Sequence, residues 1–127
     1  MVKRQAGHII NIGSIAGHEV YANGAVYCAS KHAVDALTKG MRIDLCQHGV
    51  KVSTIDPGLV NTEFSKVRFH GDQQRADSTY NGMRPLSADD VAATILYMAQ
   101  VPAHVNLAEV LLLPTDQAAA TVVKRDN

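Results

Sequence analysis

Apolar side chains in the first part of the chain follow two periods, one typical of a strand and one of a helix. Residues 7–13 form a short run of Ile and Asn between glycines that is too brief for a helix, and they predict a buried strand. Residues 25–48 repeat apolar or small side chains at helical spacing and contain no proline. They predict a long helix, which Gly49 is suited to terminate.

A second strand is predicted over residues 50–55, which are rich in β-branched side chains. We expect it to end at Asp56-Pro57-Gly58, because Pro57 cannot donate to a ladder and Gly58 permits a turn or a close backbone approach to a ligand. A turn that merely terminates the strand is the alternative. The strand, helix and strand together predict an α/β fold.

The rest of the chain is predicted to hold a long loop, a helix and a third strand. Residues 62–84 are polar and irregular, with a short helix at 73–80, and a loop of this length is suited to cover a site. Ser87 and the acids after it predict the N-cap of a helix that ends near Pro102. Residues 109–113 are almost wholly apolar, which predicts a strand buried on both faces.

Length and composition place residues 1–127 in a single globular domain, with 46% hydrophobic and 19% charged residues. Lys plus Arg and Asp plus Glu number 12 each, so net charge favours neither nucleic acid nor a membrane as partner. No apolar run reaches the roughly 18 residues of a membrane span. Gln5, His8 and Asn11 interrupt any signal-peptide core, so we expect a cytoplasmic protein. Residues 118–127 are expected to be disordered or to reach a neighbouring subunit.

The cysteines and histidines point to neither a disulfide nor a metal site. Cys28 and Cys46 fall on one predicted helix, roughly 27 Å apart at the helical rise, so they cannot pair with each other. We expect reduced thiols, in agreement with the cytoplasm. The six histidines show no His-x-x-x-His spacing and the cysteines no Cys-x-x-Cys spacing, so no metal ion is expected.

Three polar side chains are expected to meet at the end of the first predicted strand. Tyr27 and Lys31 are separated by one helical turn and therefore share a face of the long helix. Ser14 follows the strand, where a loop can fold it back over that face. Because open α/β sheets bind ligands at the carboxyl ends of their strands, the trio of Ser14, Tyr27 and Lys31 is a candidate catalytic site.

The trio suits proton transfer to or from an oxygen atom. A tyrosine is a poor base at neutral pH, but a nearby ammonium favours the phenolate, so Tyr27 beside Lys31 becomes a usable proton donor and acceptor. The Ser14 hydroxyl can hold a substrate alcohol or carbonyl oxygen in line with the phenol. With a hydride exchanged by another molecule, the trio suits alcohol oxidation or ketone reduction with a nicotinamide cofactor.

These residues lie in three blocks, GHIINIGSIAG at 7–17, YCASKHAV at 27–34 and DPGLVNT at 56–62. In order and spacing the blocks resemble the short-chain dehydrogenases/reductases. The resemblance implies a Rossmann-like doubly wound parallel sheet, an oxidoreductase acting on a CH–OH group, and a homodimer or homotetramer. It covers nearly all of this chain but only the carboxyl-terminal half of that fold, because the family's glycine-rich turn is absent from the sequence.

By the same resemblance the trio takes distinct roles. Ser14 polarises the substrate oxygen, Tyr27 transfers the proton, and Lys31 tunes Tyr27 and holds the nicotinamide ribose. The cofactor is expected to contact Tyr27, Lys31, Pro57, Gly58, Val60 and Thr62. In that last segment the backbone of Val60 meets the nicotinamide carboxamide, and the hydroxyl of Thr62 reaches toward the carboxamide or the pyrophosphate.

A narrower resemblance, to the NADP-dependent 3-hydroxy acid (serine) dehydrogenases, lies in the second half of the chain. It is carried by TEFS at 62–65, VRFHGD at 67–72, NLAE at 106–109 and PTDQA at 114–118. It implies a small 3-hydroxy acid as substrate. NADP and NAD both stay open as cofactor, because the residue that reads the ribose 2′ position follows a strand outside this sequence.

Residues near the trio are candidates for contacts with the substrate. Tyr21 and His18 precede the long helix and either line the pocket or pack over the helix start. A substrate carboxylate needs a cation, preferably an arginine with bidentate geometry. Arg68, in the long predicted loop, is our candidate for that contact, with a solvated surface charge as the alternative.

The long predicted helix also carries a smooth stripe formed by Ala29, Ala33, Ala36 and Gly40. In the family it resembles, the matching helix pairs with its symmetry mate; packing on the chain's own sheet is the alternative. A non-catalytic module that keeps this interface is our second hypothesis for function. The missing glycine-rich half favours that hypothesis, whereas the intact trio favours an enzyme.

The missing half leads to further expectations. The strand at 7–13 would be the fifth of a complete sheet, so one of its edges lacks a partner and invites aggregation. We expect Met1 to be an internal residue of a longer protein or the start of a truncated reading frame. The chain alone is expected to bind the dinucleotide weakly and to turn over little until the other half is supplied.

Overall fold

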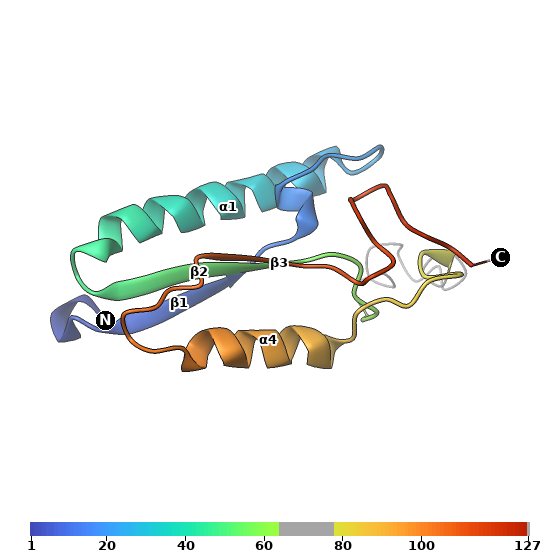
Figure 1. Cartoon of the computed structure of the whole chain (residues 1–127). Coiled ribbons are helices and arrows are strands. Elements are labelled where there is room, and N and C mark those ends of the chain that lie inside the picture. The colour runs from blue at the N-terminus through green and yellow to red at the C-terminus, as the bar shows by residue number, and fades with distance from the viewer. Residues whose placement is uncertain (64–77, 127) are drawn as a thin grey trace.

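The computed structural model describes residues 1–63 and 78–126, which form a three-stranded sheet with a helix on each face (Figure 1). The helices and strands are β1 (Gly7–Ile12), α1 (Ala25–Cys46), β2 (Val50–Pro57), α4 (Ala88–Gln100) and β3 (Glu109–Leu112), with short 3-10 helices η1 (Val2–Arg4) and η2 (Ile15–Gly17). The strands are parallel in the order β1-β2-β3. The predicted α/β class with a parallel sheet is confirmed. The helix predicted at 73–80 lies largely outside the described residues.

β2 is the central strand and contributes much of the core. Val52, Ser53 and Ile55 are completely inaccessible to solvent, because β1 and β3 flank the strand and the helices cover its faces. A polar group at that depth needs a hydrogen-bond partner. Ser53 meets this need through His8, whose Nε2 lies 2.8 Å from the Ser53 hydroxyl, and through Asn106, whose Oδ1 accepts at 2.8 Å.

The end of β2 lies further along the chain than the sequence predicts, because the strand includes Pro57. Backbone N–H groups alternate between the two neighbouring strands along a parallel ladder. Gly58 donates toward β3, to the carbonyl of Leu112 at 2.8 Å, so the preceding position faces the β1 side. Pairing with β1 stops at Ile55. The missing N–H of Pro57 therefore breaks no ladder bond.

β3 corrects one prediction, since it is not buried on both faces. Its exposure alternates along the strand, with Glu109 and Leu111 exposed and Val110 and Leu112 half-buried. β3 is the outer strand of the described sheet, so it is covered less completely than β2. Glu109 forms an ion pair with Lys39 of α1, at 3.3 Å between Oε1 and Nζ.

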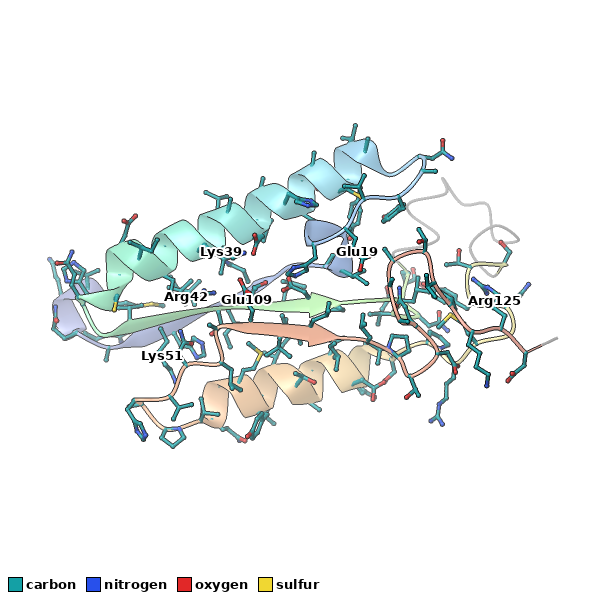
Figure 2. All side chains as sticks on the ribbon, turned by 45° about the horizontal axis from the view of Figure 1, so that its top comes forward. Glu19, Lys39, Arg42, Lys51, Glu109 and Arg125 are labelled. Carbon is teal, nitrogen blue, oxygen red and sulfur yellow. The ribbon has the colours of Figure 1, made fainter. Side chains whose placement is uncertain are left out.

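Charged side chains attach α1 to the sheet. Figure 2 shows Lys39 and Arg42 extending from α1 toward the strands. Arg42 donates from Nε to the carbonyl of Val52 at 2.9 Å and from Nη2 to the carbonyl of Ala108 at 2.7 Å. Hydrogen bonds to carboxylates, first of all that of Asp35, raise the pKa of Lys39. These contacts hold the sheet-facing side of α1 at a fixed position along the sheet.

The small-residue stripe lies on the outer side of α1. Ala29, Ala33 and Ala36 are exposed, and a Cβ atom on Gly40 would meet nothing within 4 Å. Packing of the stripe on the chain's own sheet is therefore ruled out for these positions. The subunit interface that the resemblance implies stays a prediction.

α4 begins with the predicted N-cap. Ser87 Oγ accepts a hydrogen bond from the backbone N–H of Asp90 at 3.2 Å, and Asp90 Oδ2 accepts from the backbone N–H of Ser87 at 2.7 Å. This reciprocal pair is a capping box. Chiefly because of the Ser87 backbone hydrogen bond, the pKa of Asp90 is lowered. The helix ends at Gln100, close to the predicted end.

The cysteines are free thiols, as predicted, with Cys28 buried near the start of α1 and Cys46 exposed at its end. Within residues 1–63 and 78–126, no group of three or more His, Cys, Asp or Glu side chains is placed to hold a metal ion. No helix in the same ranges has both the length and the apolar character that crossing a membrane requires.

Candidate active site

A cavity of about 620 Å³ is formed by the segments that follow β1 and β2, the start of α1, and the C-terminal tail. Its lining contains these predicted site residues: Ser14, Tyr21, Tyr27, Lys31, Pro57, Gly58, Val60 and Thr62. The structure thus brings the trio and the predicted cofactor segment to one place. Arg68, the predicted carboxylate contact, lies outside the described residues.

Ser14 is held in a defined orientation at the cavity wall. It is the N-cap of η2, has an extended backbone, and is 8% exposed. Its Oγ accepts a hydrogen bond from the backbone N–H of Ala16 at 3.1 Å. The preceding residue is tied to the sheet, because Gly13 donates to the carbonyl of Ile55 at 2.8 Å. With its acceptor side engaged, the hydroxyl is suited to donate its hydrogen to an oxygen atom in the cavity.

Tyr27 and Lys31 lie on one face of α1, as their spacing predicts. The Lys31 ammonium nitrogen is 5.9 Å from the centroid of the Tyr27 ring, within the range of a cation–π contact. The same nitrogen donates to the carbonyl of Ile12, the last residue of β1, at 3.1 Å. The sheet therefore helps to hold the positive charge beside the phenol.

Tyr21 satisfies both alternatives considered for it. It lines the cavity, and its ring packs against Gly24, the N-cap of α1, where a Cβ atom would come within 2.3 Å of the ring. His18 is not among the residues that line the cavity, and its Nε2 lies 3.0 Å from Oδ2 of Asp56. Sequence spacing contained no sign of this pair.

The segment after β2 is shaped by Gln117, a residue for which the sequence suggested no role. Gln117 is 4% exposed and lines the cavity, and its Oε1 accepts from the backbone N–H of Leu59 at 2.8 Å. A Cβ atom on Gly58 would lie 2.2 Å from that oxygen. The backbone of Gly58 therefore lies directly against Gln117, and the close approach to a ligand that the sequence predicts for Gly58 stays a prediction.

The two backbone polar groups of Val60, its carbonyl and its N–H, have different surroundings. Its carbonyl accepts a hydrogen bond from the hydroxyl of Tyr80 at 2.8 Å. Within residues 1–63 and 78–126, its N–H has no hydrogen-bond partner. Tyr80 also lines the cavity and was not among the predicted site residues. It approaches from a segment distant in sequence, so no local pattern pointed to it.

The C-terminal tail joins the site from the other side. The backbone N–H of Ala120 donates to Oε2 of Glu19 at 2.8 Å. Arg125 donates to the carbonyls of Asn81 and of Thr79, the latter at 3.1 Å. Figure 2 shows Glu19 beside the carboxyl ends of the strands and Arg125 farther out, in the C-terminal tail. Residues 118–126 thus follow the margin of the site.

Comparison with known proteins agrees with this arrangement. The family model described as short chain dehydrogenase matches residues 1–73. A Mycobacterium tuberculosis protein described as an uncharacterized oxidoreductase is 51% identical over 115 residues, which are 91% of this chain and 46% of that protein. The NADP-dependent 3-hydroxy acid dehydrogenase of Schizosaccharomyces pombe is 42% identical over 122 residues, which are 96% of this chain and 47% of that enzyme.

A solved structure, the closed form of serine dehydrogenase complexed with NADP+, superposes on the whole chain with a TM-score of 0.91 and 42% identity. The match covers 52% of that structure, so the chain spans about half the length of the proteins that it matches. The family model covers more than half of the chain and contains the trio. The chain belongs to the short-chain dehydrogenase family.

Proposed function

We propose that this chain supplies the proton-transfer and nicotinamide-binding half of an oxidoreductase that interconverts a small 3-hydroxy acid and the corresponding ketone with NADP. The observation that carries the proposal is the common cavity, which collects a serine hydroxyl, a tyrosine phenol and a lysine ammonium beside the segment after β2. No titratable group other than the phenol is needed to move a proton between the substrate oxygen and the enzyme.

In the direction of oxidation, Ser14 donates a hydrogen bond to the substrate oxygen and orients it toward Tyr27. The phenolate of Tyr27 takes the hydroxyl proton as the C–O bond gains double-bond character. The Lys31 ammonium lies 5.9 Å from the centroid of the Tyr27 ring and remains in place because it is bonded to the carbonyl of Ile12. A nicotinamide held in the cavity would supply the hydride acceptor for the carbon that bears the hydroxyl, so the substrate would give up a hydride while its hydroxyl proton passes to the Tyr27 phenolate.

The residues present fit a nicotinamide nucleotide. The N–H of Val60, which has no partner among residues 1–63 and 78–126, is a donor suited to a carboxamide oxygen, and Lys31 and Tyr27 offer donors suited to ribose hydroxyls. Thr62 adds a hydroxyl to the same cavity wall. NADP is favoured over NAD because the serine dehydrogenase structure with 42% identity contains NADP+ and the yeast relative is named for NADP.

The substrate class rests on the same two relatives, named for serine and for 3-hydroxy acids. Tyr21 and Tyr80 give the cavity amphipathic walls, suited to the short carbon chain of such an acid. Arg68 is proposed to bind its carboxylate.

Because the chain spans about half of its relatives, turnover is best measured in a chimera in which it replaces the matching segment of the Schizosaccharomyces pombe enzyme. We expect the chimera to reduce NADP+ with serine or 3-hydroxybutyrate. A Tyr27→Phe substitution removes the proton carrier, so it is expected to lower kcat by about 100-fold or more.

Tyr97→Phe is the matched control, because Tyr97 is an exposed tyrosine on α4 outside the cavity. It is expected to leave kcat unchanged. Normal turnover in the Tyr27→Phe chimera would remove the basis of the proposal. Parallel reactions with NAD+ and with alcohols lacking a carboxylate test the choice of cofactor and of substrate class.

A further inference from the structure

A buried carboxylate lies behind the turn that carries Ser14. Asp56, near the end of β2, is 2% exposed. Its Oδ1 accepts a hydrogen bond from the hydroxyl of Thr54 at 2.9 Å, and its Oδ2 lies 3.0 Å from Nε2 of His18. A carboxylate at this depth is costly unless it is paired and hydrogen-bonded. His18 is the cationic or N–H-bearing side chain that meets this requirement.

The same carboxylate touches the other end of the turn. A Cβ atom on Gly13 would lie 1.8 Å from Oδ1 of Asp56, so the carboxylate rests directly against the backbone of the residue before Ser14. His18 is the C-cap of η2, and Ser14 is its N-cap. Asp56 therefore contacts the turn on both sides of the Ser14 hydroxyl.

The opposite side of the turn is closed by α1. A Cβ atom on Gly17 would lie 3.0 Å from the carbonyl oxygen of Lys31, which shows how closely η2 packs on the helix that carries Tyr27. The turn is thus confined between Asp56 on β2 and the backbone of α1. Neither His18 nor Asp56 is among the residues that line the cavity. Their influence on a substrate is therefore indirect, and the hydroxyl that the turn between Gly13 and His18 presents to the cavity is that of Ser14.

We propose that His18 and Asp56 are positioning residues that set the distance and direction of the Ser14 hydroxyl relative to Tyr27. The proposal rests on the proposed function, in which Ser14 orients the substrate oxygen. A small misplacement of an orienting group lowers the rate of a chemical step strongly. The pair joins the turn after β1 to the end of β2 through one hydrogen bond, so the turn that carries Ser14 is tied to the central strand.

The first test is made in the chimera. His18→Leu removes the donor and is expected to lower kcat about tenfold, with the KM for NADP+ unchanged, since a misplaced orienting group slows the chemical step. His18→Gln restores an N–H donor and is expected to recover most of the rate. His104→Leu, an exposed histidine in the connection between α4 and β3, is the control and is expected to have no effect.

The second test separates positioning from a general effect on the fold. In a Ser14→Ala chimera the hydroxyl is gone, so His18→Leu is expected to cause no further loss of kcat. A merely structural role would lower the rate again in this background. An unchanged kcat in the single His18→Leu variant, or additive losses in the double variant, would overturn the proposal.

The third test needs no turnover and is made on the isolated chain by NMR. The backbone N–H of Ala16 donates to Ser14 Oγ, so its amide resonance reports the position of the hydroxyl. We expect His18→Leu to shift that resonance and His104→Leu to leave it in place. If Tyr27→Phe turns over normally, the proposed function fails, and the Ala16 resonance still decides whether the pair positions Ser14. An unmoved resonance contradicts the inference whatever the kinetics show.

Discussion

The side-chain oxygen of Gln117 lies 2.2 Å from the point that a Cβ atom on Gly58 would occupy. The glycine and the glutamine are therefore a matched pair, in which the absence of a side chain at one position admits the amide of the other. That amide holds Leu59, next to the backbone that we propose to bind nicotinamide.

Gly58→Ala is expected to lower the free energy of unfolding by about 1–3 kcal/mol, because the new methyl group displaces a buried, hydrogen-bonded amide. The new methyl group would also meet the side chain of Leu113, which lies 2.8 Å from the same point. Urea unfolding of the isolated chain measures the change. Combining Gly58→Ala with Gln117→Ala is expected to cost less than the sum of the two single changes, since the clash is removed. Strict additivity would show that the two residues do not interact.

At two other glycines, substitution by alanine is expected to have opposite effects on the stability of the fold. Gly13→Ala places a methyl group against the buried carboxylate of Asp56, and we expect a loss of stability at the upper end of about 1–3 kcal/mol. Gly40→Ala, within α1 and with no atom inside 4 Å of the new methyl group, is expected to stabilise by about 0.5–1 kcal/mol through helix propensity. Thermal unfolding of both variants measures the contrast. Equal changes for the two would contradict the packing around Gly13.

Lys31 and Lys39 lie on the same helix but face different partners. Lys31→Met removes the ammonium that bonds to Ile12 beside Tyr27, and we expect NADPH to bind the chimera about tenfold more weakly, a change of about 1.4 kcal/mol. Lys39→Met removes the ion pairs with Asp35 and Glu109 and is expected to leave NADPH binding unchanged. Fluorescence titration with NADPH measures both. Equal affinities in the two variants would contradict the role of Lys31.

The environment of His8 leads us to expect that the free energy of unfolding depends on pH. Burial, with a smaller effect from the charge of Lys51, lowers the pKa of His8 below its ordinary value of 6.5. Well above pH 6.5 the imidazole is neutral in both the folded and the unfolded chain. As the pH falls through 6.5 and then through the lowered folded value, the unfolded chain takes up the proton first, so stability decreases.

His8→Gln keeps a polar group near Ser53 but does not titrate, so the variant is expected to lose less stability on acidification than the parent chain. Urea unfolding across about pH 5 to 8 measures the difference, and the other histidines cancel because both proteins contain them. Parallel curves for the two proteins would show that His8 titrates alike in the folded and unfolded states.

Much of the candidate site follows from local spacing. Tyr27 and Lys31 share a face because a helix repeats after one turn, and the cap at Ser87 follows from its own hydroxyl and the acid at Asp90. The burial of β3 is the contrasting case. An apolar run does not reveal whether a strand lies in the middle of a sheet or at its edge, so Leu111 is exposed where burial was expected.

The sequence by itself determined the alternation of strands and helices, the family motifs and the placement of the trio at the end of a strand, since each depends on residues close together in the chain. Only the tertiary structure decided that Gln117 holds Leu59, that Glu19 binds Ala120, and that His18 meets Asp56. These pairs are separated by 58, 101 and 38 positions. Their contacts depend on how the loops fold over the sheet, and no periodicity along the chain records that path.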